Sequence, residues 1–154
     1  MTIEDDIAFL ERVPILHRLG AGALRILAIG AESYSVAAGQ LLFEAGEAAD
    51  CAYIVQRGSF ELAAANARHG GVVAGPGTLL GETALLAETL RPATATARED
   101  STVVRLSRTM FLKMLESYPD AAQGVRDLIA ARSEQWAADL DRVRAVLARG
   151  PGPR

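Results

Sequence analysis

The stretch Gly75-Pro-Gly-Thr-Leu-Leu-Gly81-Glu82-Thr83-Ala84-Leu85-Leu86, followed by Arg91-Pro92-Ala93-Thr94-Ala95, contains the residues from which the fold can be predicted. It opens with three residues that favour turns. Residues 82–88 then suit a turn or two of helix, and Gly81 before them lets the backbone pass close to another group. Small and β-branched residues alternate from Pro92 to Ala97, which predicts a strand.

The same stretch has the chemistry of an anion site. The first N–H groups of a short helix have no intrahelical partner and suit a phosphate, and the Arg91 guanidinium offers a fork of donors that matches one. A carboxylate such as Glu82 would oppose a phosphate alone, but it can accept hydrogen bonds from a ribose hydroxyl. Each of the two residues by itself is typical of an ordinary protein surface. Together and in this order they predict a pocket for a nucleotide.

These residues also carry a resemblance. The series Gly81-Glu82-Thr83-Ala84-Leu85 and Arg91-x-Ala93-Thr94 resembles the phosphate-binding cassette of cyclic-nucleotide-binding domains. Such domains occur in the catabolite activator (Crp–Fnr) family, in cyclic-nucleotide-dependent kinases and in cyclic-nucleotide-gated channels. The resemblance extends over about residues 5 to 145, through an opening helix and the first barrel strands, on the segments 9–14, 36–46 and 53–60.

The resemblance implies a role for each cassette residue. Glu82 would bind the ribose 2′-hydroxyl, Arg91 the exocyclic phosphate oxygens, and the N–H groups of Thr83 and Ala84 would assist. The ligand would be cAMP or cGMP, with cAMP the more frequent among such relatives, and we expect no prosthetic group and no metal. The predicted ligand-binding residues are Gly81, Glu82, Thr83, Ala84, Arg91, Pro92, Ala93, Thr94 and, on the terminal helix, Trp136.

Pro92 departs from the pattern of this family. The residue after the arginine is usually Ala, Ser or Thr and donates its N–H to the phosphate, whereas proline has no N–H. A hydrogen bond to a charged group contributes about 1.5–3 kcal/mol, so its loss could weaken binding about 10- to 100-fold. Pro92 also lacks the hydroxyl by which some relatives prefer guanine. It therefore favours the alternative of a dimerisation or protein-interaction module with an idle pocket.

The periodicity predicts a mainly β fold with flanking helices. Apolar residues recur at every second position within short segments separated by glycines, which indicates a small β-barrel or jelly roll (a double-stranded β-helix). These residues are Tyr34 and Val36, Leu41 and Phe43, Tyr53 and Val55, and Phe60 and Leu62. We expect one domain over residues 1–148, followed by a disordered tail at 149–154. Within it we expect N-terminal helices at 4–30, the barrel at 32–107 and C-terminal helices at 108–148.

The C-terminal part is predicted to be helical. A helix over residues 107–115 would bury Phe111, Leu112 and Leu115, and a second, long C-terminal helix would run from Pro119 to about Ala148 with an apolar stripe. The stripe favours a homodimer through paired terminal helices, although it could instead pack back on the barrel. Trp136 could cap the base of the ligand or belong to the dimer core.

Composition limits the other functions. The 154 residues carry a net charge of −3, which argues against direct DNA binding, and no apolar run approaches the roughly 20 residues of a membrane span. One cysteine, two histidines and an acidic start fit a cytoplasmic, non-catalytic protein without a signal peptide. After Ala148 there is no room for a helix-turn-helix domain, so we expect a stand-alone sensor that acts on an unknown effector protein. The alternative is the sensor half of a Crp-like transcription regulator.

Overall fold

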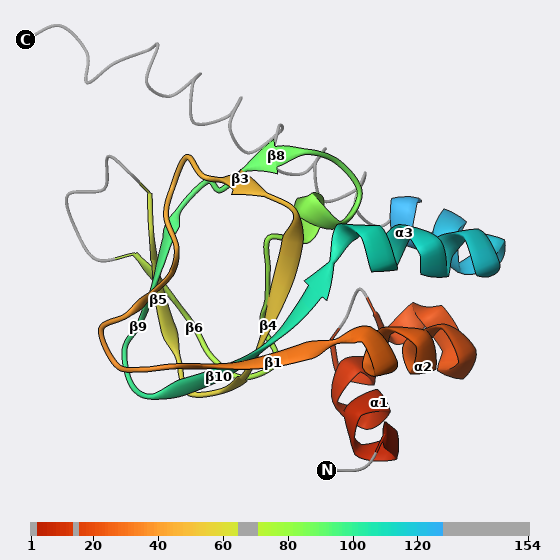
Figure 1. Ribbon diagram of the computed structural model, residues 1–154, viewed down its shortest axis with the longest axis horizontal. Coiled ribbons are helices and arrows are strands. Elements are labelled where there is room, and N and C mark those ends of the chain that lie inside the picture. Colours follow the sequence, from red (N-terminus) through yellow and green to blue (C-terminus); the bar gives the residue numbers. More distant parts are fainter. Residues whose placement is uncertain (1–2, 14–15, 65–70, 128–154) are drawn as a thin grey trace, which may run out of the picture.

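Antiparallel strands form the sheets at the centre of the structure, a computed structural model that describes residues 3–13, 16–64 and 71–127. The helices α1 (Ile3–Glu11), η1 (His17–Leu19) and α2 (Gly20–Gly30) precede the strands, and α3 (Arg108–Ser117) follows them. All three α-helices lie on one side of the strands (Figure 1). This arrangement confirms the predicted β-rich fold with flanking helices. Residues 119–127 begin another helix, but the rest of the predicted long helix, with Trp136, lies outside the described residues.

The strands form two four-stranded sheets and one small ribbon. The first sheet has the order β1-β10-β4-β7, the second β2-β9-β5-β6, and the ribbon consists of β3 and β8. No ladder joins the two larger sheets among the described strands, so the barrel is not closed by backbone hydrogen bonds. The strands are β1 (Glu32–Val36), β2 (Leu41–Phe43), β3 (Ala48–Ala49), β4 (Cys51–Arg57), β5 (Phe60–Ala63), β6 (Val72–Ala74), β7 (Leu79–Leu80), β8 (Thr89–Leu90), β9 (Thr94–Ala97) and β10 (Ser101–Ser107).

Two apolar clusters hold these layers together, and β10 contributes to both. Successive side chains of a strand point to opposite faces, so Val104 and Leu106 pack against the helices while Val103 points between the sheets. The helix-side cluster includes Leu24 and Phe111. The inter-sheet cluster includes Val36, Phe43, Val55, Phe60 and Ala95.

Helix α3 begins where predicted, but its buried face differs from the prediction. The Ser107 hydroxyl oxygen accepts a hydrogen bond from the Met110 N–H at 3.2 Å, which caps the first turn. The buried side chains are Phe111, Met114 and Leu115. The predicted burial of Leu112 is wrong, because this side chain is 37% exposed. The core stripe follows positions i, i+3 and i+4 from Phe111, and Leu112 stands one residue off that stripe.

The length and composition of the described helices decide whether any of them could span a membrane. None of them combines the length and the apolar composition needed to cross a bilayer.

Phe60 tests the inter-sheet core. Its side chain is fully buried between the sheets, so Phe60→Ala should lower the free energy of unfolding by about 3–5 kcal/mol, measured by urea denaturation. Val72 lies on the neighbouring strand β6 and is exposed, so Val72→Ala should change that free energy by less than about 0.5 kcal/mol. Equal losses in the two variants would contradict this description of the core.

Candidate functional site

The predicted cassette is a tight turn of 3-10 helix directly after β7. Helix η2 (Glu82–Leu85) is shorter than the predicted turn or two of α-helix, and Gly81 precedes it. The side chains of Ala84 and Leu85 are fully buried, and Leu85 belongs to the helix-side cluster. Burial of these two side chains fixes the cassette against the core and leaves Glu82, half-buried, and Thr83, exposed, on its outer side.

Gly81 occupies a position that only glycine fits easily. Its φ of +79° lies in the left-handed region. A Cβ atom built there would meet Nη1 of Arg91. The absence of a side chain at Gly81 therefore lets the guanidinium lie directly against the cassette backbone, as the sequence suggested for a glycine at this position.

The backbone around Arg91 is held on both sides. Arg91 follows strand β8, whose two residues pair with β3. The Arg91 N–H donates to the Glu47 carbonyl at 2.8 Å, and the Gly46 N–H donates to the Arg91 carbonyl at 2.8 Å. The predicted strand starts later than expected, because β9 begins at Thr94 rather than at Pro92. Arg91 thus stands on an anchored turn between two strands.

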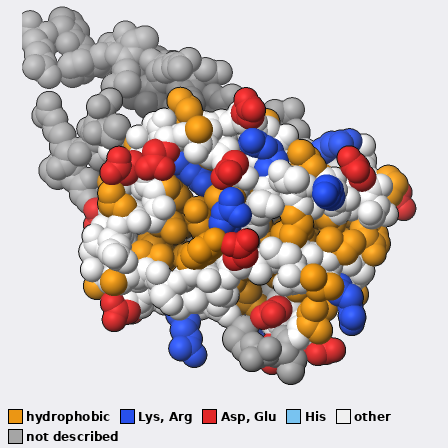
Figure 2. All heavy atoms as spheres, in the orientation of Figure 1, with side chains coloured by type: hydrophobic (Ala, Val, Ile, Leu, Met, Phe, Trp, Pro, Cys, Tyr) orange, Lys and Arg blue, Asp and Glu red, His pale blue; other side chains and the backbone are white. Residues whose placement is uncertain are grey.

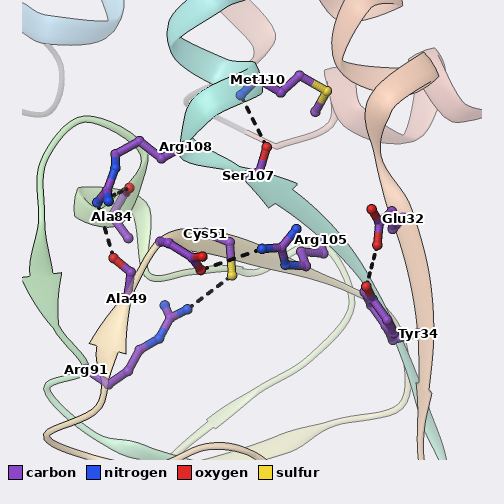
Figure 3. Close-up of polar contacts among 11 residues, drawn as sticks. Glu32, Tyr34, Ala49, Cys51, Ala84, Arg91, Arg105, Ser107, Arg108 and Met110 are labelled. Atoms are coloured by element: carbon purple, nitrogen blue, oxygen red, sulfur yellow. Dashed lines mark hydrogen bonds and ion pairs between the residues drawn. The ribbon is translucent and has the colours of Figure 1, made fainter.

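The Arg91 side chain is buried, and no acidic side chain among the described residues forms an ion pair with it. It is only 6% exposed, and its Cζ lies 4.4 Å from the centroid of the Phe43 ring and 5.5 Å from that of Tyr53. Its Nη2 donates to the Cys51 sulfur at 3.3 Å (Figure 3). Nη1 has no hydrogen-bond partner among the described residues.

This arrangement suits an anionic ligand. A buried charge costs free energy unless it is paired, and the two aromatic faces compensate it only partly, by about 0.5–2 kcal/mol. Burial, together with Cys51, raises the pKa of Tyr53 to about 12, so its phenol stays neutral beside the cation. An anion placed against Nη1 would supply both the missing charge and the missing acceptor.

The remaining cassette residues are placed in different ways. Ala84, a predicted phosphate donor, uses its N–H to donate to the Gly81 carbonyl at 3.0 Å. The Thr94 hydroxyl accepts from the Ala45 N–H at 2.9 Å and so fixes the neighbouring turn. Pro92 is exposed and Ala93 half-buried. The structure therefore gathers the cassette around Arg91. Two cassette residues, Ala84 and Thr94, already form hydrogen bonds within the protein.

Arg108, which the sequence analysis did not single out, connects the cassette to α3. Its Nη1 donates to the carbonyls of Ala87 at 2.9 Å, Ala49 at 3.2 Å and Ala84 at 3.4 Å. Figure 3 shows Arg108 reaching from the start of α3 toward Ala49 and Ala84. One guanidinium thus joins η2, β3 and α3.

Three side chains of the Arg91 environment were also missed by sequence reasoning. Phe43, Tyr53 and Cys51 come from β2 and β4. Phe43 and Tyr53 lie within segments that carried the family resemblance, whereas no sequence signal placed Cys51 beside Arg91. The alternation of apolar residues along each strand showed which side chains share a face of that strand. It did not show that Arg91 packs against this face.

The surface around the site is chemically mixed. The view in Figure 2 shows a recess lined by hydrophobic side chains, with basic and acidic side chains at its edge. Across the described ranges, no group of three or more His, Cys, Asp or Glu side chains is gathered as a metal site would require. The recognisable chemistry of the site is therefore that of the buried arginine and the cassette.

Comparison with known proteins places this site in a family. The family model described as "Cyclic nucleotide-binding domain" matches residues 34–118, which include the cassette and Arg91. The chain belongs to the cyclic nucleotide-binding domain family. A cyclic nucleotide-binding-like protein from Brucella abortus is 40% identical, with a TM-score of 0.65, and the match covers 73% of this chain and 98% of that one.

Relatives of this cyclic nucleotide-binding domain also occur within longer proteins. An uncharacterized NTE family protein of Mycobacterium tuberculosis is 37% identical over 110 residues, covering 71% of this chain but 19% of the relative. The cAMP-dependent protein kinase regulatory subunit of Yarrowia lipolytica is 37% identical over 109 residues, covering 70% of this chain and 28% of the relative. The chain thus spans about a fifth of the length of the first relative and somewhat more than a quarter of the second.

Replacement of Arg91 separates a functional from a structural role. Arg91→Met keeps the bulk of the side chain and removes an unpaired buried cation, so the free energy of unfolding should stay within about 1 kcal/mol of the original value. Leu85→Ala truncates a fully buried side chain of the cassette and should cost about 2–5 kcal/mol. Urea denaturation of both variants measures the difference. A loss in Arg91→Met as large as in Leu85→Ala would show that Arg91 mainly stabilises the fold.

Proposed function

We propose that this chain is a regulatory sensor module that binds a cyclic nucleotide, with cAMP as its ligand, and catalyses no reaction. The observation that carries the proposal is the buried Arg91, which has no acidic partner and an Nη1 without a hydrogen-bond acceptor among the described residues. Membership of the cyclic nucleotide-binding domain family supports it. The choice of cAMP is supported by the name of the related kinase regulatory subunit.

The cassette geometry suggests how the ligand would lie. The phosphate would rest between Arg91 and the start of η2, where a 3-10 helix leaves the Thr83 N–H without an intrahelical acceptor. The Ala84 N–H would be shared between the phosphate and the Gly81 carbonyl in a three-centre hydrogen bond, a type that is common at helix ends. The ribose 2′-hydroxyl would donate to Glu82.

The proposed output passes through the C-terminal helix. A ligand shifts the position of a helix only if it binds the two positions with different affinity, and Arg108 links the cassette to the beginning of α3. We propose that the following helix forms a homodimer and acts on an effector protein in the cytoplasm, with Trp136 either at the base or in the dimer core. We propose that this segment does not bind DNA directly.

One alternative has an observation in its favour. Pro92 cannot donate a backbone hydrogen bond, and the Ala84 N–H already has an acceptor. Both features would weaken phosphate binding. They favour a protein-interaction module that keeps the fold but whose pocket binds no nucleotide. A second alternative, the sensor half of a Crp-like regulator, is supported by the 26% identity and the TM-score of 0.71 to the catabolite activator protein of Thermus thermophilus.

Calorimetric titration with cAMP and with cGMP tests the proposed function. The unsubstituted chain should bind at least one of them. Arg91→Glu should abolish binding, because it places a negative charge where the positive charge would face the phosphate. Glu82→Gln should weaken binding about 10-fold or more, since it removes a charged acceptor for the ribose. Absence of heat with both nucleotides, with melting temperatures unchanged by either, would leave the idle-pocket alternative.

A pair of glycine variants tests the close approach of Arg91 to the cassette. Gly81→Ala and Gly77→Ala each place a side chain at a positive φ, +79° and +89°, so both should lose stability. A Cβ at Gly81 meets the Arg91 guanidinium, whereas a Cβ at Gly77 meets nothing within 4 Å. Gly81→Ala should therefore weaken cyclic nucleotide binding at least 10-fold, while Gly77→Ala should leave the dissociation constant within about twofold. Similar affinities in the two variants would contradict the proposed position of the phosphate.

A further inference from the structure

A second arginine, Arg105, approaches the same site from β10. Its Cα pairs with Tyr53 on β4 and with Glu32 on β1, and it lies two residues after Val103, whose side chain points between the sheets. Its side chain is partly buried, with 25% exposed. The register therefore directs a second guanidinium to the inter-sheet side, next to the ring that contacts Arg91.

The two guanidinium groups converge on Cys51. Figure 3 shows Arg91 and Arg105 approaching this residue from opposite sides. Burial lowers the pKa of Arg105, but the neighbouring Cys51 and Asp50 raise it by more, so the net shift is upward. Both arginines also act to lower the pKa of the Tyr53 phenol, against the larger effect of its burial. Arg91 and Arg105 therefore lie in one electrostatic environment.

Across the part of the chain that the structure describes, one ion pair involves either of these two cations. The carboxylate that pairs with Arg105 is Asp50, at 3.6 Å between Nη2 and Oδ1, and its side chain is 73% exposed. An exposed pair of this kind contributes only about 0–1 kcal/mol. Beside Arg105 lies a pocket of about 580 Å³, lined also by Tyr34, Leu41 and Tyr53. The guanidinium thus has a weakly bound partner and space beside it in which to turn.

We propose that Arg105 is a second phosphate-binding arginine of the cyclic nucleotide site, which exchanges Asp50 for a phosphate oxygen when the ligand binds. It supplies hydrogen-bond donors to the anionic phosphodiester in place of the backbone N–H that Pro92 lacks. The inference rests on the proposed function and deepens it. In this arrangement Asp50 competes with the ligand for Arg105, so the two residues affect affinity in opposite directions.

Opposite effects of two substitutions test the proposal, by calorimetric titration with cAMP and cGMP. Arg105→Met should weaken binding of the better ligand about 10- to 100-fold, as loss of a charged hydrogen bond predicts, and Arg105→Lys should recover part of the loss. Asp50→Asn should strengthen binding, by up to about fivefold, because it removes the negative charge that competes with the phosphate for Arg105. Arg57→Met, an exposed arginine at the far end of β4, removes the same charge and should leave the dissociation constant within about twofold.

The outcomes separate this inference from the proposed function. If Arg105 only holds Asp50 in place, both substitutions weaken binding together, and the proposal is overturned. It is equally overturned if Arg105→Met binds as tightly as the unsubstituted chain while Arg91→Glu does not bind, and the proposed function then stands alone. A chain that binds neither nucleotide overturns both. Opposite signs at Arg105 and Asp50, with Arg57→Met unchanged, support the second arginine.

Discussion

The burial of the Arg91 charge, with no ion-paired carboxylate among the described residues, is the constraint around which this site is arranged. Arg91 lies against two aromatic rings and a thiol. These groups offset only part of the free-energy cost of removing the guanidinium from water. Gly81 must lack a side chain for the guanidinium to lie there. The turn after β2 must also hold the Arg91 backbone through two hydrogen bonds. A protein selected for stability alone would place a neutral residue at this position.

The helices and the strands meet at the cassette. Leu85 joins the helix-side cluster, and Arg108 ties the carbonyls of η2 and β3 to the first turn of α3. The Arg108 N–H also donates to the Asp50 carbonyl at 2.9 Å, one residue before the cysteine that contacts Arg91. Short, directional contacts therefore connect the buried arginine with the helical side of the molecule, from which the proposed output helix continues.

Sequence reasoning succeeded where the information was local. The period of two within the short strands and the turn residues around Gly77 depend on neighbouring positions, and they indicated the fold class. Glu82 and Arg91 could be nominated because their spacing matches a family pattern. Phe43, Tyr53 and Cys51 could not, since only the register between distant strands brings them under Arg91. Leu112 was assigned to the wrong face because adjacent apolar residues on a short helix do not reveal which of them turns to the core.

The contacts of Arg91 also have a thermodynamic consequence. A free arginine side chain occupies many rotamers, and restricting it costs about 1.5–2 kcal/mol of conformational entropy. Here the restriction is imposed by Phe43, Tyr53 and Cys51, so this loss accompanies folding instead of ligand capture. Such preorganisation increases affinity without adding a contact. In the proposed complex with a cyclic nucleotide, it would compensate in part for the backbone donor that proline lacks.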